Sequence, residues 1–464
     1  MRIPCLLILM TGVMSADSIF AAERPNVIFI LADDLGWGDL GCYGHPHIKT
    51  PHLDRLARQG TLFTQFYVNG SVCSPTRAAF MTGQYPARNA VHGHFASPAQ
   101  NESRGMPNWL DPRVTLLPRL LQNSGYATAH FGKWHLGSGE GAPDPGAYGI
   151  DVHRTVNSNG PAFDSEREPY FRAESTGLIV DEAVRFIESH RDRPFYVNLW
   201  TLVPHATLHP TEEQLKPYRR FSPAGVPYQG AAQIYYASVT ALDAEIGRLL
   251  AKLDELKLAE NTIVLFSSDN GPEDIHIRNA SHSGIGSAGP FRGRKRSLYE
   301  GGVRVPLIVR WPGEVPAGRI DEESVVTAVD VLPTLGRLAG IELPNGHQGD
   351  GEDISDILRG QSRPRSTPIC WEWRFRIAGD PVHHSPMLAI REGDWKLLMN
   401  PDRSRIELYN VPNDRMELKN LAHERPEVVE RLSRQVLDWQ KTLSEGPIDD
   451  QAGQIHYGWP RREG

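Results

Sequence analysis

The sequence predicts an α/β fold with a mainly parallel sheet sandwiched by helices, followed by a smaller C-terminal α+β subdomain of antiparallel strands and a helix. Apolar runs of strand length alternate with amphipathic helical segments over roughly the first 340 residues. Several runs are apolar throughout, as expected of strands buried on both faces of a parallel sheet. Beyond residue 365, short strand-like segments separated by tight turns precede a final helix, which is typical of a small antiparallel sheet.

Each predicted element rests on a local pattern. Thr50, Pro51 and a closing Gly60, for example, mark the start and the end of a helix. The predicted strands span residues 26–32, 62–68, 126–131, 195–200, 262–268, 305–311, 386–392, 395–400 and 406–410. The predicted helices span residues 50–60, 77–83, 114–125, 174–190, 231–256, 330–340 and 426–443. Residues 138–172, which are rich in Gly, Pro, Asp and Asn, are predicted to form a long loop.

The N-terminus has the features of a secretory signal peptide. Arg2 precedes a short apolar core and small residues that end near Ala21 and Ala22. We therefore predict a signal peptide over residues 1–22, a periplasmic or secreted protein, and no membrane segment after cleavage. The net charge of −7 gives no reason to expect nucleic-acid binding.

The cysteine count leaves one thiol unaccounted for. Cys5 would leave with the signal peptide, so the mature chain keeps Cys42, Cys73 and Cys370. An odd number in an oxidising compartment suggests that one of them has a separate fate. Cys42 and Cys370 either pair or remain two buried thiols, and the sequence leaves both alternatives open.

Cys73 lies where a predicted strand turns into a helix. Helix N-terminal N–H groups and Arg77, four residues later, favour an anion there and would acidify a thiolate. The alternative is a small buried cysteine with no chemical role.

Carboxylates follow two of the predicted buried strands. Asp33 and Asp34 end the first strand, and Asp269 and Asn270 follow the strand 262–268. Oxygen ligands of this kind suit a hard divalent cation. Ordinary turn chemistry is the alternative for each pair; it is preferred for Asp33 and Asp34 taken alone, whereas the position of Asp269 and Asn270 beyond a buried strand favours ligation.

Two further segments carry proton-transfer groups and cations. Lys133 and His135 are two residues apart, so in extended backbone they face the same side and could act on one anion. His205 follows directly after another predicted strand. A surface lysine and structural histidines are the alternative.

Taken with these residues, three motifs resemble signatures of the type I, formylglycine-dependent sulfatases of the alkaline-phosphatase-like superfamily. They are Cys-x-Pro-x-Arg at 73–77, Gly-Lys-x-His-Leu-Gly at 132–137 and Lys-x-x-x-x-Glu-Gly-Gly at 295–302. Six matched segments in the family's order, between about residues 25 and 310, make a chance match improbable. The resemblance implies the alkaline-phosphatase-like fold, with a catalytic domain over residues 23–365 and a C-terminal subdomain over residues 366–464.

The resemblance also implies a reaction and its cofactors. It implies that a formylglycine-generating maturation enzyme converts Cys73 to formylglycine, whose hydrate attacks the sulfur of a sulfate ester. It further implies that Ca²⁺ is held by Asp33, Asp34, residue 73, Asp269 and Asn270. The implied catalytic residues are Cys73, Arg77, Lys133, His135, His205 and Lys295. After His205, Ala206-Thr207-Leu208-His209 replaces the family's more usual Thr-Pro continuation.

The expected substrate is an exported sulfated carbohydrate, such as a polysaccharide or a glycosaminoglycan. Arg292, His282 and Trp109 are the predicted substrate-binding residues, with Arg294 and Arg296 as further candidates. Two other functions remain open: a phosphonate or phosphate monoester hydrolase of the same superfamily, and a non-catalytic protein that binds sulfated glycans.

Overall fold

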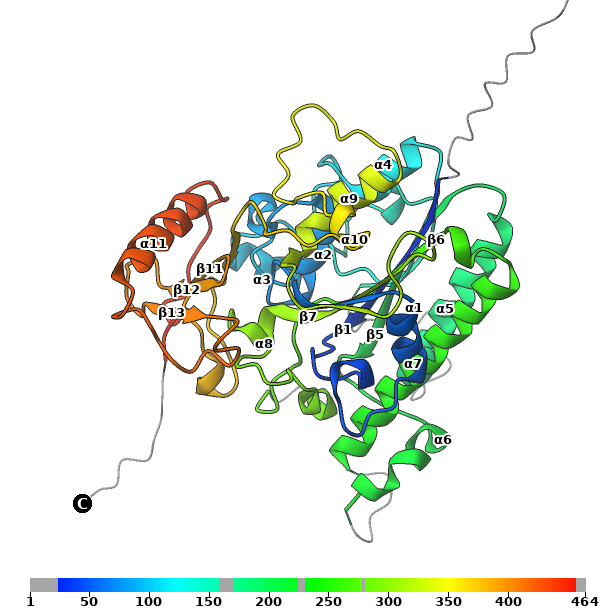
Figure 1. Cartoon of the computed structure of the whole chain (residues 1–464), viewed down its shortest axis with the longest axis horizontal. Coiled ribbons are helices and arrows are strands. Elements are labelled where there is room, and N and C mark those ends of the chain that lie inside the picture. The colour runs from blue at the N-terminus through cyan, green and yellow to red at the C-terminus, as the bar shows by residue number, and fades with distance from the viewer. Residues whose placement is uncertain (1–23, 158–170, 224–229, 278–279, 456–464) are drawn as a thin grey trace, which may run out of the picture.

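The structure is a computed structural model that describes residues 24–157, 171–223, 230–277 and 280–455. The predicted signal peptide, residues 1–22, lies outside the described residues. Two sheets organise the described chain, one of nine strands in the larger part and one of four antiparallel strands near the C-terminus (Figure 1). The fold class predicted from the sequence is confirmed.

The nine-stranded sheet is parallel apart from one strand. Its strands are β1 (Asn26–Asp33), β2 (Thr61–Tyr67), β3 (Ala127–Lys133), β4 (Val152–Val156), β5 (Phe195–Pro204), β6 (Thr262–Ser268), β7 (Arg304–Arg310), β8 (Arg319–Asp321) and β9 (Val326–Thr327). They lie in the order β4-β3-β5-β1-β6-β7-β2-β8, with β9 beside β2. Only β7 runs against its neighbours β6 and β2. The most apolar strand, β1, therefore occupies a central position between β5 and β6.

Helices cover both faces of this sheet (Figure 1). The helices of the larger part are α1 (Pro51–Gln59), α2 (Cys73–Thr82), α3 (Pro98–Ser103), α4 (Leu117–Asn123), α5 (Phe171–Ser189), α6 (Glu212–Leu215), α7 (Ala231–Glu255), α8 (Glu300–Val303), α9 (Val331–Leu338) and α10 (Ser355–Leu358). Successive residues of β1 enter two cores. Val27, Phe29 and Leu31 pack with α2, α4 and α9, whereas Ile28 and Ile30 pack with α1, α5 and α7. Successive side chains of a strand point to opposite faces of the sheet, so this alternation shows that β1 is buried on both faces.

The second sheet is a meander covered by one helix. It consists of β10 (Ile369–Glu372), β11 (Leu388–Glu392), β12 (Trp395–Met399) and β13 (Glu407–Asn410), and α11 (Pro426–Gln440) packs on one face. Leu388 and Ile390 face α11, whereas Ala389 and Leu398 belong to the core of the larger part. The small sheet is therefore packed on both faces. The domain boundary at residue 365 stays a prediction.

Short and polar elements are the ones that the sequence did not reveal. The predicted loop 138–172 contains β4, an edge strand whose sequence Val-His-Arg-Thr-Val has no apolar run. Strands β8, β9 and β10 were not predicted either, since each has at most four residues. Helix α2 begins at Cys73 rather than at residue 77, because Pro75 is tolerated in the first helical turn, where N–H groups are unpaired in any case.

The mature cysteines do not form a disulfide, since Cys42, Cys73 and Cys370 are all free thiols. Of the two alternatives for Cys42 and Cys370, the structure supports separate thiols. In the part of the chain that the structure describes, none of the helices has both the length and the apolar character of a membrane span.

A buried ion cluster connects the small sheet to the larger part. Lys396 of β12 lies 2.9 Å from Glu300 of α8 and 3.0 Å from Glu417, and all three side chains are fully buried. Arg304 adds a second cation 3.1 Å from Glu300. Burial by itself would raise the pKa of Glu300, but the charges of Lys396 and Arg304 outweigh this effect and lower that pKa to about 2. The cluster is satisfied only while the two parts are docked.

We expect Lys396→Met to lower the free energy of unfolding by about 3–5 kcal/mol, because it leaves two buried carboxylates without their shared cation. Urea unfolding followed by circular dichroism measures this change. The matched control is Lys441→Met, whose side chain is 75% exposed and should change the free energy by less than about 0.5 kcal/mol. Equal effects of the two substitutions would contradict a stabilising role for the cluster.

Candidate active site

The carboxyl ends of four adjacent parallel strands meet at one edge of the large sheet. Asp33 ends β1, Lys133 ends β3, His205 follows β5 and Asp269 follows β6. Because β2 runs in the same direction, the loop after it brings Cys73, the first residue of α2, to the same edge. In such sheets this edge is where ligands bind. The topology therefore assembles the predicted groups from segments far apart in sequence.

Two residues of this edge have backbone conformations that are unfavourable for their type. Asp34 has a φ of 65° and His135 a φ of 52°, both in the left-handed region. The Asp34 backbone N–H donates to Asp269 Oδ1 at 3.1 Å, which helps to hold that conformation. Unfavourable backbone that is maintained by its surroundings is a feature of functional sites.

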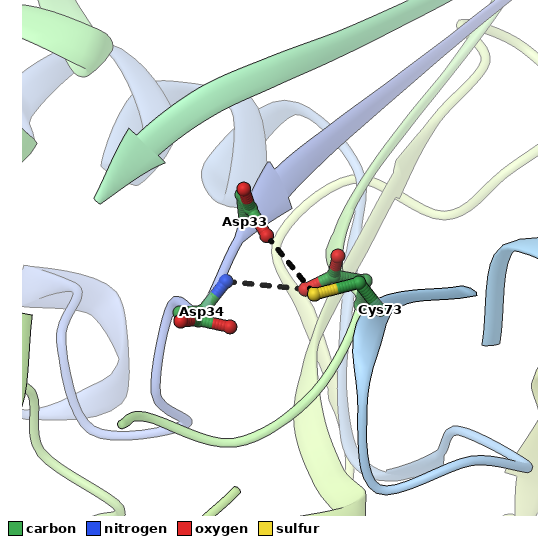
Figure 2. A group of neighbouring side chains, drawn as sticks. Asp33, Asp34 and Cys73 are labelled. Carbon is green, nitrogen blue, oxygen red and sulfur yellow. Dashed lines mark hydrogen bonds between the residues drawn. The ribbon is translucent and has the colours of Figure 1, made fainter. Parts of the chain in front are cut away.

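Cys73 faces the carboxylates at the end of β1 (Figure 2). Its Sγ lies 3.6 Å from Asp33 Oδ1 and accepts from Lys133 Nζ at 3.4 Å. Burial raises the pKa of the Cys73 thiol to about 12, although Lys133 and Lys295 act in the opposite direction. The expectation of an acidified thiolate is therefore wrong for cysteine itself, since desolvation outweighs the helix terminus and the cations.

Arg77 is fully buried and fixed by three hydrogen bonds. Its Nε and Nη2 donate to Asp269 Oδ2 at 3.0 and 2.6 Å, and its Nη1 donates to the Lys133 carbonyl oxygen at 2.9 Å. The guanidinium also stacks over Trp200 at 5.1 Å from the ring centroid. Arg77 thus orients both a carboxylate and the end of β3.

Two lysines neutralise the other carboxylates. Lys133 Nζ donates to both oxygens of Asp33 at 2.9 and 2.7 Å, and Lys295 Nζ donates to both oxygens of Asp34 at 2.7 and 2.8 Å. Burial alone would lower the pKa of Lys295, but the charge of Asp34 raises it above its ordinary value. With Arg77 and Asp269 included, three cations balance three carboxylates in a volume without bulk water.

Burial disfavours the charged form of both predicted catalytic histidines. Burial lowers the pKa of His135 far below its usual range, and Lys133 adds to the effect. His135 Nε2 lies 3.1 Å from the Phe95 carbonyl oxygen and so carries the proton, which leaves Nδ1 buried and without a partner. In His205 the Ala206 carbonyl, 2.7 Å away, places the proton on Nδ1, and Nε2 lies 3.8 Å from Asp34 Oδ2. Burial also lowers the pKa of His205.

The oxygen atoms fit a divalent cation. Ligand atoms of Asp33, Asp34, Cys73 and Asp269 all lie within 4.8 Å of one another. Asn270 donates through Nδ2 to Asp34 Oδ1 at 2.7 Å, and its Oδ1 is buried without any donor in the described structure. An unpaired carbonyl oxygen beside three carboxylates is suited to a hard cation such as Ca²⁺. The five residues predicted as metal ligands are thus brought together.

A cleft of about 460 Å³ opens over these groups. Its lining includes Cys73, His135, His205 and Lys295, and also His94 and Glu273, which the sequence analysis did not identify. Glu273 pairs with Arg296 at 2.5 and 3.0 Å. His94 stands in no motif and follows no strand, so no sequence signal marks it.

The predicted substrate-binding residues do not line this cleft. Arg292 donates to the Val382 carbonyl oxygen at 3.0 Å and stacks over Tyr299 at 3.8 Å, so it contacts the C-terminal part instead. Trp109 pairs with Gly137 through an isolated β-bridge. His282 belongs to the short 3-10 helix Ser281–Ile285, next to the lining residue Ser283. Arg294 donates to the carbonyl oxygens of 273 and 284, and of the basic run only Lys295 and Arg296 face the cleft.

Two family profiles match the chain. The sulfatase family profile matches residues 25–341, which contain every group described above. The chain belongs to the sulfatase family. A second profile, the C-terminal region of N-sulphoglucosamine sulphohydrolase, matches residues 289–442. The protein is therefore a sulfuric ester hydrolase.

Curated sulfatases of mammals are similar over most of their length. The chain is 35% identical to the steryl-sulfatase of Mus musculus over 455 residues, which covers 78% of this sulfatase and 70% of that protein. It is 33% identical to the N-acetylgalactosamine-6-sulfatase of Canis lupus familiaris, covering 83% and 74%. Arylsulfatase A of Homo sapiens is also 33% identical, with 82% and 76% covered.

Solved structures show the same fold. Ps i-CgsB in complex with k-i-k-neocarrahexaose superposes with a TM-score of 0.77 at 26% identity, covering 94% of this sulfatase and 96% of that chain. A 6S-sulfatase described under glycosaminoglycan metabolism of Bacteroides thetaiotaomicron has a TM-score of 0.73 at 26% identity, covering 90% and 100%. The phosphonate monoester hydrolase of Agrobacterium radiobacter, with a TM-score of 0.66 at 21% identity over 90% and 96%, shares the fold. The expected alkaline-phosphatase-like fold is thereby confirmed.

Asp269→Asn tests the cation site, since it removes one of the three carboxylates and keeps the side-chain shape. After chelator treatment, the unsubstituted protein should gain thermal stability when millimolar Ca²⁺ is added. A ligand at about 100 times its Kd stabilises by about 2.7 kcal/mol. We expect Asp269→Asn to lose most of this gain, measured as the shift in Tm.

The matched control is Asp394→Asn, which changes an exposed carboxylate in the turn between β11 and β12. It should show the same Ca²⁺-dependent shift as the unsubstituted protein. An undiminished shift in Asp269→Asn would contradict the assignment of the cation site.

Proposed function

We propose that this sulfatase is an exported carbohydrate sulfatase that acts through formylglycine at position 73 and a calcium ion. The observation that carries the proposal is the placement of Cys73 Sγ, 3.4 Å from Lys133 Nζ and 3.6 Å from Asp33, at the base of a cleft. Every other polar group that the reaction needs lies around this atom.

The charge balance supports a divalent ion together with an anionic substrate. Three carboxylates and three cations cancel, so the site by itself has no excess positive charge for a sulfate ester. A bound calcium ion would add two positive charges and polarise the sulfate oxygens. Lys133, Lys295 and Arg77 would then be oriented to stabilise the charge that spreads over those oxygens, the contribution that is usually largest.

The raised pKa of Cys73 supports modification of this residue. A thiol that remains protonated near neutral pH is a poor nucleophile. Conversion to formylglycine replaces sulfur by oxygen and removes two hydrogens, a two-electron oxidation for which the maturation enzyme would provide the oxidant. The hydrated aldehyde would supply one hydroxyl whose oxygen bonds to sulfur as the bond from sulfur to the leaving oxygen breaks, and it would keep a second hydroxyl.

The histidines supply the two proton transfers. His205 and Lys295 line the same cleft, and the protonated form of His205, which burial disfavours, would give its proton to a leaving oxygen. His135 is neutral with an unpaired Nδ1, which suits a base that takes the proton of the second hydroxyl and releases sulfate. These roles match the residues implied by the sulfatase resemblance.

A carbohydrate substrate and export are supported by the relatives and by the N-terminus. Two structures that match at 26% identity are named for a carrageenan oligosaccharide complex and for glycosaminoglycan metabolism. The N-terminal 22 residues have a signal-peptide pattern, which would deliver the enzyme to the periplasm or beyond, where such polymers occur.

The test is a paired measurement of modification and of sulfate release. Mass spectrometry of the peptide around residue 73 should show the loss of sulfur and two hydrogens and the gain of oxygen in protein co-expressed with a maturation enzyme. That protein, with Ca²⁺, should release sulfate from an aryl sulfate and from some members of a panel of sulfated mono- and oligosaccharides. Cys73→Ala should lower kcat by at least about 1,000-fold, because the attacking atom is removed.

The matched control is Cys370→Ala, a free and buried thiol outside the cleft. It should retain the rate of the unsubstituted protein for each folded molecule. Release of sulfate at the full rate by Cys73→Ala would contradict the proposal. Faster turnover of aryl phosphate or phosphonate esters would favour the alternative esterase, and binding of sulfated glycans without any turnover by modified protein would favour the non-catalytic alternative.

A further inference from the structure

A second cleft of about 450 Å³ adjoins the one that contains Cys73. His94 and Arg296 line both clefts, so the two hollows share one boundary. Besides Arg296, the second cleft is lined from three segments: residues 93–104, which include α3 and its C-cap Arg104, and residues 373–378 and 447–449 of the C-terminal part. A substrate unit next to the reacting one would therefore enter a space that the C-terminal part helps to build.

The walls of the second cleft are fixed by direct contacts. Arg374, which lies just after β10, donates to the carbonyl oxygens of Ser444 and Gly446 at 2.9 and 3.2 Å. These hydrogen bonds hold the chain that leads to Pro447 against the chain that follows β10. A side chain at Gly93 would meet Phe375 at 3.0 Å, so the two walls are in close contact there. These contacts hold the walls of the second cleft in place.

The second cleft carries more positive than negative charge. Arg104, Arg296 and Arg376 line it, and Asp449 is the one carboxylate among the lining residues in the described structure. Asp449 already accepts backbone N–H groups of residues 376 and 451 at 3.3 and 2.8 Å. Arg296 is neutralised by Glu273, which leaves Arg104 and Arg376 as the uncompensated cations.

The contacts of Arg104 show how one of these two cations is positioned in the cleft. Its Nη1 donates to the His94 carbonyl oxygen at 3.0 Å, and its guanidinium lies 5.6 Å from the centre of the Phe375 ring. Within residues 24–157, 171–223, 230–277 and 280–455, no carboxylate pairs with it. A half-buried guanidinium held at the boundary of two clefts without a counter-ion is arranged to meet an anion from outside.

Aromatic side chains complete the surface. Trp373 and Phe375 line the second cleft, and Trp373 is only 5% exposed. Phe375 is partly exposed, and its apolar ring surface suits the C–H faces of a sugar.

We propose that the second cleft binds the sugar unit adjacent to the one that loses its sulfate, and that Arg104 and Arg376 recognise an anionic oxygen group on that unit. The substrate is then an oligosaccharide or polysaccharide with acidic groups on neighbouring units. The group is either a second sulfate ester or a carboxylate, since both present oxygens to a guanidinium fork. The inference rests on the proposed function, because it assumes that the first cleft holds a sulfated sugar.

The experiment measures binding in a Cys73→Ala background with Ca²⁺ present, by calorimetry of the full chain. One probe pair is the chondroitin 6-sulfate disaccharide and its carboxyl-reduced form. The other is a neocarratetraose with two sulfates and its singly sulfated form. We expect at least one probe to bind about 10-fold or more tightly than its partner that lacks one anionic group, because hydrogen bonds to charged groups are among the stronger ones. Which pair shows the preference distinguishes carboxylate from sulfate.

Substitution then tests the two arginines. Arg104→Ala and Arg376→Ala together should bring the affinity ratio within the pair to about 1, and Arg104→Lys should retain part of it. The matched control is Arg434→Ala on α11, which is 73% exposed and should leave the ratio unchanged. An unchanged ratio in the double variant, no preference within either pair, or no binding of either pair would overturn the inference. Binding is measured without turnover, so it is independent of sulfate release. If the affinity preference is found but the modified protein releases no sulfate, only the proposed function is overturned.

Discussion

The structure depends on the mutual neutralisation of three buried carboxylates and three buried cations at one edge of the large sheet. Asp33, Asp34 and Asp269 could not be desolvated together without Lys133, Lys295 and Arg77, since unpaired buried charges cost several kcal/mol each, by order of magnitude. Each carboxylate has one dominant cationic partner within 3.0 Å. The positions of these side chains are therefore fixed by their mutual ion pairs before a substrate arrives.

The sheet topology explains why so much of this site could be predicted. Residues at the ends of long apolar strands are easy to locate in a sequence, and parallel strands bring their carboxyl ends to the same edge. Asp33, Lys133, His205 and Asp269 all follow such strands, so placing the strands also placed the residues. The motif around Cys73 and the family resemblance then predicted a chemical role for each of these residues.

What could not be predicted depends on contacts between distant segments. Arg292 belongs to the same basic run as Lys295, but its side chain turns toward Tyr299 and the C-terminal part, and no local pattern indicates this direction. The elevated pKa of Cys73 has a similar origin, because it follows from complete burial rather than from the helix terminus that the sequence reveals. The edge strand β4 lacks an apolar run, since only one side of it pairs with the sheet.

The C-terminal part contributes both to a buried ion cluster and to the lining of the second cleft. Its sheet is attached to the larger part through Lys396 and the carboxylates of Glu300 and Glu417, and α8, which contains Glu300, follows the Lys295 loop closely in the chain. The segment after β10 forms a wall of the second cleft. The groups around Cys73 lie at the ends of strands of the large sheet, whereas most of the lining of the second cleft comes from segments outside that sheet. The side chains that balance the buried charges are therefore separate from most of those that line the second cleft.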